Sequence, residues 1–246
     1  MIRLFILLLL PVVLKSQPVH IVSYELDYNF AFDTSDAKVI LRLKGDLNVL
    51  PDGRSVFFQV QDREYNASVL MNNHQFMMED SIMYILKHPA SNQLYFKDFT
   101  PVAMDKWIAD SLHPFSWDIS SDTLHEGGVV LQKASTRFRG RLYTAWFNPA
   151  VPIPNGPWKF GGLPGLIYRI SDEHDFFVYR LTGIVTQNTA TASYKMPKKP
   201  ILSIEKYAQL TDRWLKKYIV ELKAADASCE SCNTEIKHFE QLEYFN

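Results

Sequence analysis

A proline- and glycine-rich segment in the second half of the chain constrains the fold more than any other feature of the sequence. Four of the ten glycines and five of the thirteen prolines lie between Pro149 and Gly165. Proline fixes φ at about −65°, whereas glycine adopts backbone conformations that other residues avoid, so few shapes are open to such a segment. It also carries bulky apolar side chains that need a surface to pack against. We therefore expect an ordered loop and not a flexible linker.

Local geometry within this segment favours a structural role. Leu163 precedes a proline and is expected to be extended, and Pro164 and Gly165 suit the centre of a type II turn, which predicts a positive φ at Gly165. The segment lacks the Lys-Ser/Thr end of a phosphate-binding loop. We expect a wedge that closes one end of a sheet, with direct ligand contact as the alternative. The residues assigned to this loop are Pro157, Trp158, Phe160, Gly161, Gly162, Leu163, Pro164, Gly165, Leu166 and Ile167.

The same segment resembles a family signature. Residues 162–167 read Gly-Leu-Pro-Gly-Leu-Ile and resemble the motif that names the GLPGLI family of bacterial envelope proteins. The chain departs from the family at Ala150, where an acidic residue is usual, and at Val130 and Leu131, where a cysteine is common. The family has no assigned biochemical activity, so the resemblance implies a compartment and no catalytic residues. Upstream similarity to the family covers residues 138–141, 145–147, 152, 156–157 and 160–161.

Residues 1–16 are typical of a secretory signal peptide. Arg3 supplies the positive end, residues 4–14 the apolar stretch, and Ser16 a small residue before cleavage. Pro11 interrupts the stretch, which is too short to span a bilayer, and this argues against a buried strand or an anchor helix. No second long apolar run follows. We expect an exported chain without a transmembrane segment, in the periplasm, at the outer membrane or outside the cell.

The remaining sequence predicts mainly β structure. Short runs rich in β-branched and aromatic residues, separated by turn signals, are typical of antiparallel strands, whereas residues 64–79 fit neither period. We expect a single β-rich domain over residues 17–246, built as a curved antiparallel sheet or half-open barrel. The expected strands cover residues 21–32, 37–49, 56–61, 81–87, 93–99, 129–147, 166–171 and 176–181, with another possible at 190–196.

One helix is expected at about residues 203–225. Ser203 suits the N-cap, and Glu205 in the first turn complements the helix dipole. The apolar stripe faces away from a lysine-rich side, which favours a C-terminal helix packed on the sheet over a helix lying on a membrane surface. The stripe consists of Ile204, Tyr207, Ala208, Leu215, Tyr218, Ile219 and Leu222.

Three arginines form a candidate anion contact. If residues 136–147 are one strand, alternation places Arg137, Arg139 and Arg141 on the same face. Their guanidinium groups suit a phosphate or carboxylate, such as a lipid headgroup. The favoured alternative is a solvated face paired with nearby acids.

Two cysteines near the C-terminus have the spacing of a redox pair. Cys229 and Cys232 follow the expected helix, whose negative end, together with Glu230, disfavours a reactive thiolate. We therefore expect a structural disulfide between them, with half of a metal site as the weaker alternative.

Composition and motifs limit the functions that we expect. Without residues 1–16 the chain has 24 basic and 27 acidic residues, a net charge of −3, which argues against a nucleic-acid partner. The seven histidines follow no metal-binding pattern, and no nucleophile motif is present, so we expect no metal, cofactor or catalytic set. By analogy of fold, we expect a non-enzymatic binding or chaperone-like module for a lipid, another apolar ligand or an outer-membrane protein. The alternatives are a structural accessory subunit of an envelope complex and, less favoured, a hydrolytic or redox enzyme.

The signal peptide predicts where the mature chain begins. Cleavage after Ser16 should leave Gln17 at or near the new N-terminus. N-terminal sequencing of protein recovered from the cell envelope tests this expectation. A cytoplasmic protein that keeps Met1 would contradict it.

Overall fold

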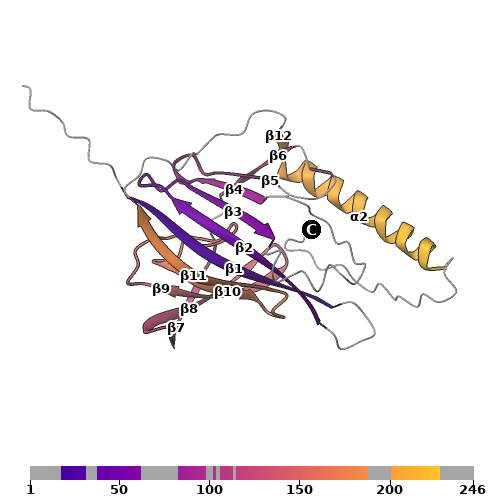
Figure 1. Ribbon diagram of the computed structural model, residues 1–246. Coiled ribbons are helices and arrows are strands. Elements are labelled where there is room, and N and C mark those ends of the chain that lie inside the picture. The colour runs from indigo at the N-terminus through magenta and orange to yellow at the C-terminus, as the bar shows by residue number, and fades with distance from the viewer. Residues whose placement is uncertain are drawn as a thin grey trace, which may run out of the picture.

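The described strands of this protein form one open sheet, whose two outermost strands do not pair with each other. The computed structural model describes residues 18–31, 38–61, 83–97, 102–103, 106–112, 115–187 and 201–227. In these residues twelve strands lie in the order β12-β6-β5-β4-β3-β2-β1-β11-β10-β9-β8-β7 (Figure 1). The strands are β1 Val19–Ala31, β2 Lys38–Val49, β3 Ser55–Gln61, β4 Met83–His88, β5 Gln93–Lys97, β6 Trp107–Ser111, β7 Asp118–Glu126, β8 Val129–Phe138, β9 Arg141–Asn148, β10 Leu166–Asp172, β11 Phe177–Gln187 and β12 Ile201–Ser203.

The sheet consists of two meanders joined along one strand pair. Strands β1 to β6 pair antiparallel in chain order, and so do β7 to β11. β11 returns to pair antiparallel with β1, whereas β12 pairs parallel with β6. β7 and β12 therefore lie at the two ends of the sheet. The expected mainly β fold with a curved sheet is confirmed, and the sheet is not closed into a barrel.

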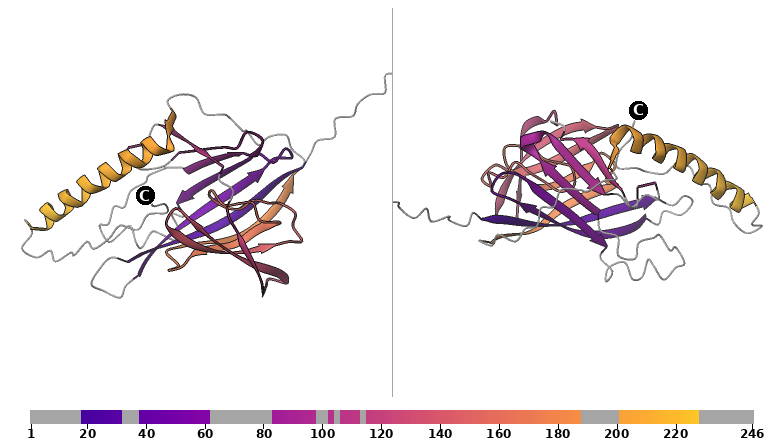
Figure 2. Two further views of the ribbon diagram at one scale, coloured as in Figure 1. Left: turned by 180° about the vertical axis from the view of Figure 1, so that it is seen from behind. Right: turned by 90° about the horizontal axis from the view of Figure 1, so that it is seen from above.

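The two faces of the sheet differ in polarity. On β1 the side chains of Val22, Tyr24 and Leu26 are buried on one face, while Glu25 and Asp27 point to the opposite face. We call the first of these the inner face, because neighbouring strands extend it with most of the hydrophobic core. Figures 1 and 2 show the sheet curling around this side.

The connection between β9 and β10, residues 149–165, packs onto the inner face. We call it the signature loop. Its Trp158, Phe160 and Leu163 side chains are at most 2% exposed and belong to the core. The ring of Phe160 packs edge-on against Tyr143 of β9, with 4.8 Å between centroids. At the end of the loop, the Tyr24 hydroxyl donates a 2.7 Å hydrogen bond to the carbonyl oxygen of Ile167. The loop therefore fills the inside of the curved sheet.

The expected C-terminal helix is confirmed as α2, Ile204–Ala227. Ser203 caps it, since its Oγ accepts a 3.3 Å hydrogen bond from the backbone N–H of Lys206. Tyr207 is buried and meets Phe96 of β5 edge-on at 5.6 Å. Beyond these first turns the helix extends away from the sheet (Figure 2). Among the described residues, no helix combines the length and apolarity needed to cross a bilayer.

Three strands were not expected from the sequence. β7 has a polar sequence without an apolar face, and β6 and β12 are only five and three residues long. Propensity and alternation give little signal for such strands, because neighbouring strands supply the pairing. Several expectations lie outside the described residues: the signal peptide, the undecided segment at 64–79, the possible strand at 190–196 and the disulfide between Cys229 and Cys232.

The expected positive φ at Gly165 is wrong. Gly162 has a φ of +85°, whereas Gly165 is outside the left-handed region. The N–H of Gly165 donates to the carbonyl of Leu163 at 2.8 Å, which makes a tighter turn around Pro164 than the type II turn that we expected. Glycine is required for another reason. A Cβ at Gly165 would lie 2.2 Å from the backbone oxygen of Asn148.

This close approach predicts a stability loss for Gly165→Ala. We expect the free energy of unfolding to fall by about 1–3 kcal/mol, because the loop must shift away from β9 to admit the methyl group. Gly183→Ala in β11 is the matched control, since nothing lies within 4 Å of its added Cβ and its φ is not positive. Equal denaturation midpoints for Gly165→Ala and the wild type would contradict the steric explanation.

Candidate functional site

A buried lysine from β4 anchors the signature loop. Lys87 lies on the inner face and is 3% exposed. Its Nζ donates hydrogen bonds to Oδ1 of Asn155 at 2.9 Å, to the carbonyl of Gly156 at 3.0 Å and to the carbonyl of Phe160. An ammonium group has three N–H donors, and here each donor has an acceptor. Oxygen atoms of the loop therefore replace water around a buried charge.

Asn155 connects the same part of the loop to a second strand. Its Nδ2 donates a 3.0 Å hydrogen bond to Oγ of Ser55 on β3, and its Oδ1 also accepts the N–H of Gly156 at 2.9 Å. Ser55 lies directly opposite Lys87 in the pairing of β3 with β4. One amide group thus binds two paired strands at once. A buried polar network whose members are all satisfied fixes one arrangement of the segment that it holds.

A second buried group of charges lies beneath the loop. The Asp110 side chain on β6 is 1% exposed, and its Oδ2 lies 2.7 Å from Nη2 of Arg139 and 3.6 Å from Nζ of Lys159. Lys159 belongs to the loop, is buried, and places its Nζ 3.8 Å from the ring centroid of Phe96. A buried carboxylate with two cationic partners and an aromatic face beside one of them forms a satisfied cluster.

The two contacts of Asp110 hold distant parts of the sheet together. β6 is next to one end of the strand order, whereas Arg139 belongs to the turn between β8 and β9 near the other end. The indole Nε1 of Trp117 adds a 2.9 Å hydrogen bond to the carbonyl of Gly161. Side chains and the loop thus join the two ends where backbone pairing does not.

Two residues of this region adopt unfavourable backbone conformations. Trp158 has a φ of 48° and Arg139 a φ of 43°, in the left-handed region that non-glycine residues seldom occupy. Each conformation costs on the order of 1 kcal/mol or more and persists only where surrounding contacts impose it. Trp158 directly precedes Lys159, which lies near Asp110. Arg139 is itself the residue that pairs with Asp110. Strain and buried charge therefore coincide at one place.

The expected row of three arginines is wrong. Residues 136–147 are not one strand, because β8 ends at Phe138 and a turn at Arg139 and Gly140, both with positive φ, starts β9. Arg139 pairs with Asp110, and Arg141 forms a buried 2.7 Å ion pair with Asp172. Arg137 is exposed. Anion contact by these arginines stays a prediction, now without the shared face.

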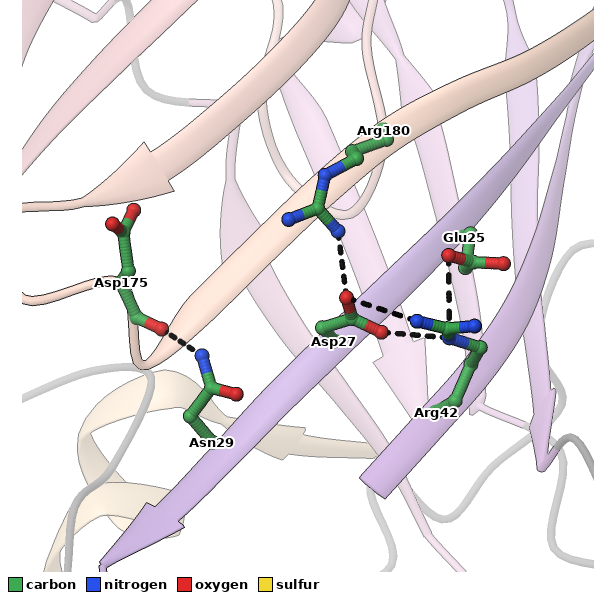
Figure 3. Close-up of polar contacts among 6 residues, drawn as sticks. All are labelled: Glu25, Asp27, Asn29, Arg42, Asp175 and Arg180. Carbon is green, nitrogen blue, oxygen red and sulfur yellow. Dashed lines mark hydrogen bonds and ion pairs between the residues drawn. The ribbon is translucent and has the colours of Figure 1, made fainter. Parts of the chain in front are cut away.

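A separate charge network braces the opposite face where the two meanders meet. Asp27 on β1 accepts hydrogen bonds from Arg42 of β2 at 2.8 and 3.3 Å and from Arg180 of β11 at 2.7 Å (Figure 3). Glu25 adds a 3.2 Å ion pair to Arg42. Burial raises the pKa of Asp27, but the hydrogen bonds from the two arginines outweigh it and hold that pKa below its ordinary value. Asp27 thus stays ionised and links three adjacent strands.

Sequence reasoning missed the buried charges. Lys87 had a usable signal, because it follows Met83 and Ile85 at alternate positions on a strand whose inward side is apolar. Lys159 lies between Trp158 and Phe160, in an apolar context that is unusual for lysine. The partner Asp110 gave no signal. Within the described part of the chain, no three His, Cys, Asp or Glu side chains gather into a possible metal site.

The chemistry open to this region is limited by burial. Asp110 and Lys159 are both buried, and Nζ of Lys159 lies against the ring of Phe96. As they lie, the buried charges bind the loop itself. The region therefore anchors the signature loop through residues of β4, β6 and the turn before β9.

A family model described as "Protein of unknown function (Porph_ging)" matches residues 117–169. This region runs from Trp117 through β7, β8, β9 and the signature loop into β10. The chain is thus similar to an uncharacterised family over the part that contains the loop. Membership of the GLPGLI family stays a prediction. No curated protein matches the sequence.

Among solved structures, the fold is similar to part of PNGF-II in two crystal forms. The P21 form aligns with a TM-score of 0.50 at 11% identity, and the C2 form with 0.47 at 12% identity. Each alignment covers 79% of this chain but only 33% and 32% of PNGF-II. The chain therefore spans about a third of the length of PNGF-II. At such low identity the likeness concerns the fold alone.

The burial of Lys87 predicts how stability depends on pH. Burial lowers its pKa from 10.5 to about 7, because a charged ammonium group loses its hydration. The unfolded chain then binds more protons than the folded chain between these values, so the free energy of unfolding should rise from pH 7 to pH 9, by up to about 1.4 kcal/mol per unit.

Lys87→Met should abolish this slope, whereas Lys217→Met, at an exposed helix position, should keep it. Denaturant titrations at each pH measure both, and the ¹³Cε shift of Lys87 reports its pKa directly. An identical slope in wild type and Lys87→Met would contradict the assignment to Lys87.

Proposed function

We propose that this protein is an exported envelope protein that works as a non-enzymatic binding module for a protein partner. The observation that carries the proposal is the occupation of the inner face by the chain's own signature loop. Trp158, Phe160 and Leu163 take the place that an apolar ligand would need. Binding then has to use outer surfaces and strand edges.

The buried charges support a module without a catalytic step. Lys87 is used to bind loop oxygens, and Asp110 is used to bind Arg139 and Lys159. A catalytic group must reach a substrate, and these groups reach the loop instead. Arg141 and Asp172 are likewise committed to each other at 2.7 Å.

The sequence supports the proposed compartment of the protein, and the fold supports its proposed role as a module. The expected signal peptide at residues 1–16 and the resemblance of residues 162–167 to the GLPGLI motif support export to the envelope of a bacterium. The match of residues 117–169 to an uncharacterised family supports a shared role for the region that contains the loop. A similar fold makes up about a third of PNGF-II, which supports a unit that works beside other parts of a larger assembly.

Native mass spectrometry of the protein purified from its own envelope tests the proposal. We expect a retained protein partner at defined stoichiometry and no retained apolar small molecule. In parallel, the wild type should give no saturable fluorescence increase with an apolar naphthylamine probe, because the inner face is full. Retention of a lipid, or saturable probe binding, would favour the carrier hypothesis and overturn this one.

A further inference from the structure

The strand at one end of the sheet presents a free edge. β7 pairs with β8 on one side, and no described residue pairs with it on the other. Its side chains are exposed or half-buried along the whole strand, and the turn that follows at Gly127 and Gly128 is exposed. A bulge between Ile119 and Thr123 interrupts the pairing, so the regular part of the edge runs from Thr123 to Glu126. An unpaired strand edge is a template for a further strand.

The two faces of this edge strand differ in charge. Asp118, Asp122 and Glu126 share one face by alternation, and β7 contains no lysine or arginine. The other face carries Ile119, which is 42% exposed and lies opposite Ala134 of β8, together with Thr123 and His125; Val130 of β8, 48% exposed, lies opposite His125. The edge therefore combines an acidic row on one face with a face that carries no carboxylate on the other.

These charges argue against pairing with a second copy of the chain along the whole length of β7. An antiparallel β7–β7 pair centred on Asp122 would set Asp122 against its own copy and Asp118 against Glu126. Like charges directly opposite each other destabilise a strand pair. The same positions favour a strand with basic residues. Lys133 of β8 already pairs with Asp122 at 3.3 Å, but both side chains are well exposed, so this contact is weak and exchangeable.

We propose that β7 binds an extended segment of a partner protein in which lysine or arginine alternates with uncharged residues. Main-chain hydrogen bonds along Thr123 to Glu126 supply affinity, and alternate side chains supply specificity. The basic side chains face Asp122 and Glu126, and the uncharged ones lie on the face of Thr123 and His125. This inference rests on the proposed function and gives its partner a docking strand and a chemical class.

A defined peptide tests the inference with the full-length protein. The probe is a labelled decapeptide that alternates lysine and valine. One control alternates glutamate and valine, and another has the probe's composition with the five lysines in one block. We expect the probe to bind more tightly than both controls and to slow hydrogen exchange of backbone amides in β7. Equal affinity for the blocked peptide, or unchanged exchange in β7, would overturn the inference.

Charge reversal adds a matched test. The Asp122→Lys, Glu126→Lys double variant should lose about tenfold in affinity for the lysine peptide and gain affinity for the glutamate peptide, because two attractive cross-strand pairs become repulsive. Both positions are exposed, so the melting temperature should not change. Asp212→Lys, Glu221→Lys on the exposed side of α2 raises the net charge by the same amount, so it is the control for net charge and should leave both affinities unchanged. Unchanged affinities in the β7 variant would overturn the inference.

This experiment separates the two proposals. If envelope-purified protein retains a protein partner but the lysine peptide does not bind, the docking strand is wrong and the binding module stands. If that protein retains an apolar small molecule instead, the proposed function fails whatever the peptide does.

Discussion

Three oxygen atoms of the signature loop converge on the ammonium group of Lys87, and the rest of the inner face is arranged around that contact. An open curved sheet has an apolar interior that must be covered, and here a loop from the same chain covers it. Apolar side chains such as Phe160 supply most of the buried area, but apolar packing is not directional. The lysine and Asn155 fix which part of the loop lies over which strands, since buried hydrogen bonds specify position more sharply than apolar contact does.

The ion pair between Asp110 and Arg139 connects the two ends of the open sheet. In a closed barrel, backbone hydrogen bonds join the first and last strands. Here β7 and β12 remain apart, and side chains near the two ends make the connection instead. The sheet can therefore curve strongly around the loop without meeting the strict register that closure imposes. The strained conformation of Arg139 is a cost of this arrangement.

The sequence predicted the strands of the fold more accurately than the contacts of the candidate site. The physical reason differs from residue to residue. Alternation along β1 and the apolar run of β4 predicted strands because burial on one face imposes that pattern. The edge strand β7 is exposed on both faces, so nothing imposes a pattern on it. Gly165 was correctly identified as a glycine-dependent position but for the wrong cause, since the clash with Asn148 depends on a contact between β9 and the loop that no local rule contains. The pairing of Asp110 with Arg139 likewise depends on how the sheet curves.

The pairing of β1 with β11 also sets the order in which this chain can fold. Val19 lies opposite Gln187, so the two strands that join the meanders are separated by most of the chain. The first meander can form from local contacts, but the edge of β1 stays unpaired until β11 has been synthesised and delivered. Pairings between such distant segments form late, and exposed strand edges favour aggregation in the interval. Until β11 pairs with it, this edge of β1 is open to pairing with a strand of another chain.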